Sequence, residues 1–283
     1  MSEAVNCFVW NVDPEIFSLG PLKFRWYGLM FAVMFLLGYR LLAWQFERGE
    51  HKKDTAMRFL IYIFVGMLIG AYFGHRIFYE WDAFISNPLS ALDIRGGIRG
   101  LASHGASVGI IAAAYIFHRK TKIRFLELMD RMTMGGTLAT IFVRVGNLFN
   151  SEIVGRKSEV AWAFCFPRAD RGALIPRHPS QIYEAIIGVF VLGAMFLIDK
   201  RAGEEKRPLG LLFGSFLVIY FSLRFFVEFF KEYQTLPTSS PLTMGQFLSI
   251  PFVAYGVGVI IWSLKTRLPA GIPPKEKGKK RKG

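Results

Sequence analysis

The sequence predicts an all-α, polytopic membrane protein: a bundle of about seven transmembrane helices with a small extracytoplasmic head. Of its 283 residues, 52% are apolar and 16% are aromatic, and the mean hydropathy is +0.33. Apolar runs of about 17 residues or more recur along the chain, and they lack the period-two alternation of membrane β-strands. These observations favour a helical bundle that has the bilayer as its solvent.

Seven segments are predicted to span the membrane. They are residues 26–43, 59–79, 101–117, 129–149, 182–198, 209–230 and 244–264. Twenty Lys and Arg residues fall in the loops after the first, third and fifth segments and in the C-terminal tail, against ten in the opposite loops. The positive-inside rule therefore predicts an N-terminus outside and a C-terminus in the cytoplasm.

A single integral membrane domain is expected over residues 1–267, followed by a basic, disordered cytoplasmic tail over 268–283. Two extracytoplasmic loops, 80–100 and 151–181, are long enough for small structures, and the second is the predicted head. The first 20 residues contain acidic side chains and lack the basic flank of a signal peptide, so the first span is expected to anchor the chain.

The net charge of +14 is spread over short loops and the tail. This distribution fits membrane topology and contact with anionic lipids better than nucleic-acid binding. The chain has no phosphate-binding loop, dinucleotide fingerprint, zinc-protease pair or serine-hydrolase elbow, so neither a cofactor nor a metal is predicted. Cys7 and Cys165 are too far apart for a metal motif and do not suggest a disulfide framework.

Polar residues close the fourth predicted span, where an arginine costs about 2.5–3.5 kcal/mol or more in hydrocarbon. Arg144, Asn147, Ser151 and Gly155 are three or four residues apart, so they would share one face if the helix continued. Gly146 would allow a close approach by a backbone or a ligand. A functional site is the favoured interpretation, and a polar helix–helix contact is the alternative.

A second polar stripe lies in the sixth predicted span. Tyr220, Arg224 and Glu228 are spaced i, i+4, i+8 among phenylalanines. An Arg224–Glu228 ion pair is the structural alternative. Two arginines within one bundle instead favour a clamp for a phosphate group, which the planar guanidinium binds through two donors.

His104 and Tyr27 are the remaining polar candidates. His104 is surrounded by small residues, and an imidazole suits proton transfer near neutral pH, although a satisfied polar contact is the commoner role. Tyr27 equally fits the aromatic belt at a membrane interface. Residues 177–184 are predicted to contain a helix start, with Pro179 in its first turn.

Together these residues resemble the prolipoprotein diacylglyceryl transferase family over most of the chain. The strongest motif is the arginine–glycine–asparagine signature from Arg144 to Gly155. The supporting motifs are residues 26–30, 177–184, 220–230 and 244–251. The resemblance implies a bacterial inner-membrane enzyme that moves the diacylglyceryl group of phosphatidylglycerol to the lipobox cysteine of a prolipoprotein signal peptide, giving a thioether and glycerol phosphate.

The resemblance also implies roles for individual residues. His104 would be the base or a proton relay, and Arg144 and Arg224 would hold the phosphate. The implied substrate-binding residues are Tyr27, Asn147, Asn150, Glu152, Gly155, Tyr220 and Glu228. Among these, Tyr27 and Asn147 would orient headgroup or glycerol oxygens, while Glu152, Tyr220 and Glu228 would position the arginines.

The sequence departs from the family pattern at two places. His104-Gly105-Ala106-Ser107 stands where the family usually has His-Gly-Gly-Leu, and Tyr72 stands where members commonly have an arginine. Arg76, one turn later, is the candidate substitute. A transporter of an anionic or lipid substrate is the alternative function, although the chain shows none of the internal repeats typical of transporters.

Overall fold

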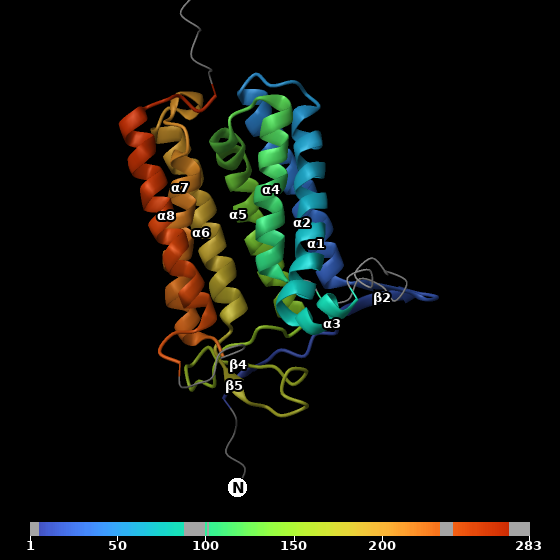
Figure 1. Cartoon of the computed structure of the whole chain (residues 1–283). Helices are drawn as coiled ribbons and strands as arrows, with labels where there is room; N and C mark the ends of the chain where they lie inside the picture. The colour runs from blue at the N-terminus through green and yellow to red at the C-terminus, as the bar shows by residue number, and fades with distance from the viewer. Residues whose placement is uncertain (1–5, 88–99, 101, 233–239, 272–283) are drawn as a thin grey trace, which may run out of the picture. The chain divides into compact units, whose positions relative to one another are not determined.

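A computed structural model describes residues 6–87, 100, 102–232 and 240–271, and most of these residues are helical (Figure 1). The α-helices are α1 (Trp26–Arg48), α2 (Thr55–Tyr79), α3 (Trp81–Ser86), α4 (Ser103–Thr121), α5 (Phe125–Phe149), α6 (Ser180–Arg201), α7 (Leu211–Val227) and α8 (Met244–Thr266). Short 3-10 helices, η2 (Glu204–Lys206) and η3 (Glu228–Phe230), follow α6 and α7. The chain forms two compact units, a larger one of Met1–Leu42 with Met132–Gly283 and a smaller one of Ala43–Arg131.

Five of the described helices are long and apolar enough to cross a bilayer: α1, α2, α6, α7 with its 3-10 extension, and α8. The chain is therefore a multi-pass membrane protein with the predicted helical fold. Helices α4 and α5 coincide with the third and fourth predicted spans but do not meet the same length and composition criteria. In α5 the charged residues Glu127, Asp130, Arg131 and Arg144 lower the apolar character.

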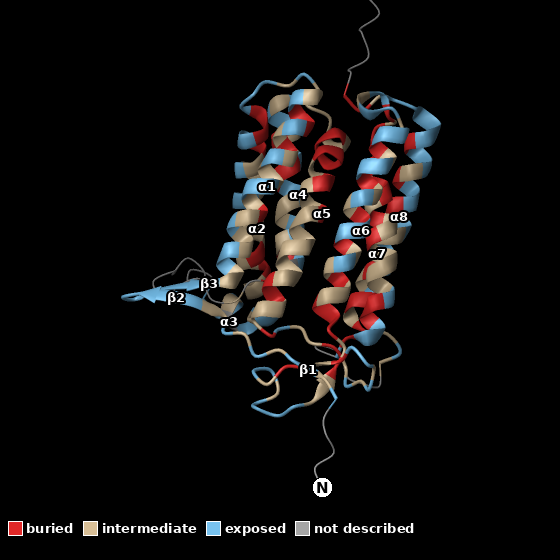
Figure 2. Cartoon of the chain, turned by 180° about the vertical axis from the view of Figure 1, so that it is seen from behind, coloured by how far each residue is buried: buried red, intermediate tan, exposed pale blue. Residues whose placement is uncertain are grey.

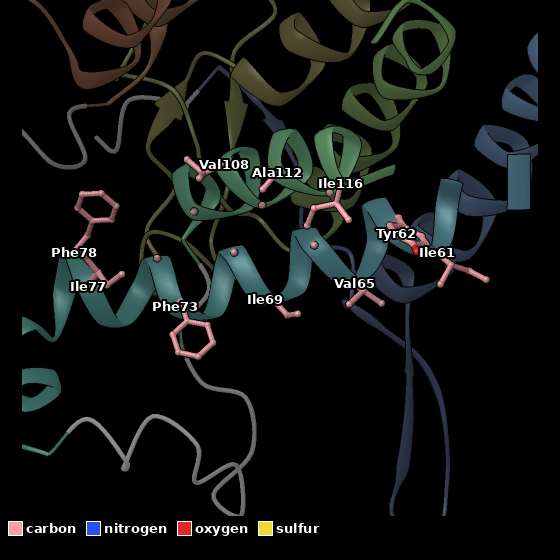
Figure 3. A pocket seen from close by; sticks show the side chains of 16 residues that line it. Ile61, Tyr62, Val65, Ile69, Phe73, Ile77, Phe78, Val108, Ala112 and Ile116 are labelled. Atoms are coloured by element: carbon pink, nitrogen blue, oxygen red, sulfur yellow. The ribbon is translucent and has the colours of Figure 1, made fainter. Parts of the chain in front are cut away.

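In the smaller unit, α2 and α4 pack closely because glycines face each other. A Cβ on Gly70 would lie 2.2 Å from the Gly105 carbonyl oxygen, and one on Gly109 would lie 2.0 Å from the Gly66 carbonyl oxygen. Small residues at four-residue spacing allow such backbone contact in membranes. Figure 3 shows the apolar side chains along these two helices, which line a cavity of about 640 Å³.

In the larger unit, α6 packs on α7 and α7 packs on α8 (Figure 1). Gly214 and Gly256 bring α7 and α8 together, since a Cβ on either would lie within about 3 Å of the other's carbonyl oxygen. The core of this unit contains the buried residues Met134, Val191, Met195, Leu212 and Tyr220. Figure 2 shows exposed positions along α6 and α8. Many of them carry large apolar side chains, such as Ile186, Phe190 and Ile261, as expected for helices that contact lipid.

An antiparallel hairpin precedes α1, and the sequence analysis missed it. Its strands are β2 (Glu15–Leu19) and β3 (Leu22–Arg25), and Phe17 pairs with Phe24. The two phenylalanine rings stack with their centroids 4.5 Å apart, and both strands are almost wholly exposed (Figure 2). Strands this short carry too few alternating positions for a clear sequence signal.

The predicted head, residues 151–181, contains two short strands, β4 (Phe164–Cys165) and β5 (Pro176–Arg177). A third strand, β1 (Phe8–Val9), comes from the N-terminus and pairs with β4 in parallel. Next to this pairing, Cys7 and Cys165 form a disulfide, which the sequence analysis did not predict. The bond joins residues 158 positions apart in the sequence, and folding alone brings them together.

The N-terminal segment also reaches the end of α5. The Trp10 indole nitrogen donates to the Leu148 carbonyl oxygen at 2.8 Å. On the other side of the head, Arg177 donates to both carboxylate oxygens of Asp170, and this hydrogen bonding raises the pKa of Arg177. The disulfide and the indole tie the head, through the N-terminal segment, to the helix end that carries the signature, while the Arg177–Asp170 pair joins two parts of the head itself.

The first residues of the predicted disordered tail, 268–271, are instead held by backbone hydrogen bonds. The Ala270 nitrogen donates to the Arg207 carbonyl oxygen at 2.9 Å, and the Gly271 nitrogen donates to that of Glu205 at 3.2 Å. These bonds hold residues 268–271 against the turn after α6. The rest of the tail, 272–283, and residues 88–99 of the first predicted loop lie outside the described residues.

Replacing Cys7 by Ser is expected to destabilise the head by about 2–4 kcal/mol, because the unfolded chain is no longer cross-linked. Thermal unfolding of the purified protein measures the change, and it should match that of wild-type protein treated with a reductant. Reductant should then have no further effect on the variant. Equal unfolding temperatures for the variant and the oxidised wild type would contradict the structural role of the disulfide.

Candidate active site

Helix α5 ends at Phe149, so the predicted continuous helical face from Arg144 to Gly155 does not form. After the helix the backbone turns sharply, and Ser151 and Ile153 adopt positive φ values of 54° and 55°. The Glu152 nitrogen then donates to the Asn147 carbonyl oxygen at 2.9 Å. The signature is therefore a helix end followed by a folded-back loop, an arrangement that helical spacing alone does not reveal.

This turn places the Glu152 carboxylate above the last turn of α5. It accepts from the Asn147 amide at 3.2 Å and from the Asn150 amide at 3.2 Å. The Asn147 amide oxygen lies 3.4 Å from Nη1 of Arg144. Asn147 thus connects the Glu152 carboxylate to the Arg144 guanidinium, and its own side chain is fixed at both ends.

Glu184, in the first turns of α6, contacts three cations. Its Oε2 lies 2.8 Å from Nε of Arg144, and its Oε1 lies 3.4 Å from Nη1 of Arg224 and 3.6 Å from Nζ of Lys231. The two arginines that the sequence placed on different spans therefore converge on one carboxylate. The expected alternative, an Arg224–Glu228 pair, is replaced by this contact, while Glu228 pairs with Lys231 at 3.0 Å.

The cluster carries an excess positive charge. Arg144, Arg224 and Lys231 face two carboxylates, Glu184 and Glu228, which leaves one positive charge. Lys231 and Glu184 are only 5% and 4% exposed, whereas Arg144 and Arg224 are 12% and 23% exposed. A singly charged anion would neutralise the cluster. It would contact the arginines before Lys231, because their side chains are more exposed.

One nitrogen of the Arg144 guanidinium, Nη2, is available as a hydrogen-bond donor. Nε faces Glu184 and Nη1 faces Asn147, while Nη2 makes no hydrogen bond to any described residue. The contacts of Arg224 and Lys231 with Glu184, at 3.4 and 3.6 Å, are longer than strong hydrogen bonds. These donors are consequently available to a second anion without the loss of a short bond.

Three glycines allow the backbone and side chains around the cluster to meet. A Cβ on Gly146 would lie 2.6 Å from the Tyr27 ring, so this ring packs on the signature helix. A Cβ on Gly155 would lie 2.3 Å from the His178 carbonyl oxygen, and one on Gly245 would lie 2.4 Å from the Glu228 carboxyl carbon. Gly155 thus joins the signature loop to the start of α6, and Gly245 leaves room for the Glu228 carboxylate.

Tyr220 adjoins the cluster through Arg224, whose guanidinium hydrogen-bonds the tyrosine side chain. The Tyr220 ring is buried and stacks on Phe216, with the ring centroids 5.3 Å apart. His104 belongs to the smaller unit, where it is exposed at the second residue of α4. In the same unit, Arg76 donates to the Tyr72 hydroxyl at 3.1 Å and pairs with Glu80.

A polar cavity of about 340 Å³ opens beside the signature loop. It is lined by Asn150 and Glu152 together with Asp13, Pro14, Glu15, Arg25 and Arg168. Its lining contains both carboxylates and guanidinium groups, so the cavity suits a ligand with several hydroxyl or amide groups. Asn147 and Glu152 connect this cavity to the Arg144 side of the charged cluster.

Two residues of the cluster were missed by sequence reasoning. Glu184 was included only in a predicted helix start, and Lys231 was counted only as a loop charge. A carboxylate in the first turns of an apolar span is an unusual intramembrane charge, and that signal was present in the sequence. The sequence did not show which cations Glu184 contacts, because Arg144, Arg224 and Lys231 come from three different parts of the chain.

Replacing Glu184 by Gln is expected to destabilise the protein by about 3–5 kcal/mol, because the buried Lys231 and the partly buried Arg144 and Arg224 lose their shared carboxylate. Thermal unfolding in detergent measures the loss. The matched control is Glu15→Gln, which removes an exposed pair with Lys23 and should change stability by less than about 1 kcal/mol. Equal effects of the two substitutions would show that the Glu184 contacts do not hold the cluster.

Comparison with known proteins identifies the family. Residues 14–262 match the model of the prolipoprotein diacylglyceryl transferase family. A phosphatidylglycerol–prolipoprotein diacylglyceryl transferase of Chloroherpeton thalassium is 41% identical over 258 residues, which is 90% of this chain and 94% of the relative. Proteins of the same name from Tolumonas auensis and Bacteroides fragilis are each 37% identical, covering 91% and 88% of this chain and 98% and 92% of their own lengths. With the family model matched over residues 14–262 and relatives this similar over most of its length, the chain belongs to the prolipoprotein diacylglyceryl transferase family.

Proposed function

We propose that this protein transfers the diacylglyceryl group of phosphatidylglycerol to the thiol of the lipobox cysteine in a prolipoprotein signal peptide. The observation that carries the proposal is the convergence of Arg144 and Arg224 on Glu184, within a chain of this family. The cluster has one uncompensated positive charge, and a phosphodiester carries one negative charge. A phosphatidylglycerol headgroup therefore matches the cluster in charge.

In the proposed reaction the cysteine sulfur attacks the glycerol carbon that carries the phosphate ester. A carbon–sulfur bond forms, the carbon–oxygen bond to phosphate breaks, and the thiol proton passes to a base. Glycerol phosphate leaves with additional negative charge. Because Arg144 and Arg224 face this developing charge, they would stabilise the transition state more than the bound lipid.

The surrounding residues support this assignment. Asn147 and Tyr27 lie beside Arg144 and would orient headgroup or glycerol oxygens. Glu184 contacts both arginines directly, Glu152 fixes Asn147, and Glu228 pairs with Lys231, so Glu152 and Glu228 would position the arginines through these neighbours. The polar cavity beside Asn150 and Glu152 would receive the hydroxyl groups of the headgroup.

The proposed setting is the bacterial inner membrane, with seven spans, an outer N-terminus and a cytoplasmic C-terminus. The Cys7–Cys165 disulfide supports this orientation, because such bonds persist in oxidising compartments. It joins the N-terminal segment to the head, and both are placed outside by the distribution of Lys and Arg. Helices α4 and α5 would supply the two spans beyond the five apolar ones.

Mass spectrometry tests the function directly. Purified protein incubated with phosphatidylglycerol and a lipobox peptide should add one diacylglyceryl mass to the peptide cysteine. Arg144→Lys and Arg224→Lys should each lower the rate on the order of 100-fold, because lysine keeps the charge but cannot form paired hydrogen bonds. An unmodified peptide, with the lipid carried across vesicle membranes instead, would favour a transporter and refute the transferase.

His104 is proposed as the base or a proton relay. His104→Asn should lower the transfer rate by about 100-fold or more. The matched control is His118→Asn, since His118 lies at the opposite end of the same helix and faces the Ile123 carbonyl oxygen. Full activity of the His104 variant at every pH would assign the proton transfer to another group.

A further inference from the structure

We propose that a groove between α5 and α6 holds part of one acyl chain of the lipid whose phosphate binds Arg144. The inference rests on the proposed function and locates the lipid within the larger unit. The groove has a volume of about 350 Å³. It is lined by Ile141, Arg144, Val145 and Leu148 of α5 and by Gln181, Ile182, Ala185, Ile186 and Val189 of α6.

The surface of the groove is apolar, and Arg144 contributes the carbon atoms of its side chain to it. Gln181 donates to the Glu152 carbonyl oxygen at 2.7 Å, so its amide nitrogen is already paired. Arg144 lines the groove and also contacts Glu184 of the charged cluster. A phosphodiester on this guanidinium would therefore have the groove directly beside it for an attached chain.

The surroundings of the groove identify hydrocarbon as its occupant. Ile186 and Val189 are 61% and 59% exposed on α6, which is apolar enough to span the bilayer. Water and polar ligands are excluded from such a surface by the lipid around it. The bilayer interior is as apolar as the groove, so moving an acyl chain from one to the other gains little free energy. The groove therefore orients the lipid more than it raises its affinity.

Packing behind the groove explains why it is narrow. A Cβ on Gly188 would lie 2.6 Å from Ile141 Cγ1, so the two helices touch at this level. From Leu148 to Ile141 the groove follows α5 for seven residues, or about 10 Å. Its size suits the chain segment nearest the glycerol, and the rest of the chain would continue into the bilayer.

The cavity between α2 and α4 is larger, about 640 Å³, but it lacks a charged lining residue (Figure 3). A lipid there would have no cation from that lining for its phosphate. The α5–α6 groove is apolar, and the side chain of Arg144 runs from its lining to the charged cluster at Glu184, so an acyl chain in the groove and a phosphate at the cluster would belong to one phospholipid.

Photocrosslinking of the wild-type protein tests the inference without requiring catalysis. The probe is phosphatidylglycerol with a diazirine on an acyl carbon close to the glycerol ester, in detergent or nanodiscs. Peptide mapping should find the label concentrated on groove residues such as Ile182, Ala185 and Val189. Label spread evenly over exposed apolar residues, including Phe226 and Ile250, would overturn the proposal, as would label concentrated between α2 and α4.

A substitution that fills the groove gives an independent result. Ala185→Phe should lower both the groove label and kcat/KM for phosphatidylglycerol at least fivefold. The matched control is Gly193→Phe on the same helix, because Gly193 is exposed and a Cβ on it would meet no neighbouring atom within 4 Å. Unchanged label in Ala185→Phe would contradict the groove assignment. If that variant does not fold, the distribution of label on the wild-type protein alone tests the groove assignment.

The same samples separate the two proposals. Groove labelling without any diacylglyceryl peptide would leave the acyl-chain site standing and refute the transferase. Formation of the diacylglyceryl peptide without groove labelling would support the transferase and refute the acyl-chain site.

Discussion

The Glu184 carboxylate is the interaction on which the site depends. It is almost fully buried, and it contacts cations from α5, from α7 and from the segment after η3. Without it, three positive charges would face one another in a medium of low dielectric constant, where repulsion is strong. The carboxylate therefore permits the arginines to converge, and convergence is what a phosphate clamp requires.

The cations lie at different distances from the Glu184 carboxylate. Nε of Arg144 is 2.8 Å from it, while Arg224 and Lys231 lie farther away, at 3.4 and 3.6 Å. An arriving phosphate can recruit the looser donors without breaking short hydrogen bonds. The remaining positive charge favours the anion, and it favours the leaving glycerol phosphate more because its charge is greater.

Backbone contacts keep these side chains in place. Gly155 and Gly245 occupy positions where a Cβ would strike a carbonyl oxygen or a carboxylate, so close packing joins the signature loop, the start of α6 and the start of α8. The Thr243 and Gln246 capping box fixes where α8 begins. In the head, the disulfide and the Trp10 indole hold the N-terminal segment against the end of α5. Packing around the cluster thus supplies the precision that long charged side chains lack.

The sequence by itself determined the helical membrane fold, because hydrophobic length is a local property that survives without tertiary information. It also identified Arg144, Asn147, Glu152, Arg224 and Glu228 as candidates, since polar groups in apolar segments are conspicuous. The folded-back signature, the hairpin before α1, the disulfide and the central place of Glu184 were decided only by the tertiary structure. Each of these depends on positive φ angles, short strands or partners distant in sequence, and such features leave little trace in hydrophobic periodicity.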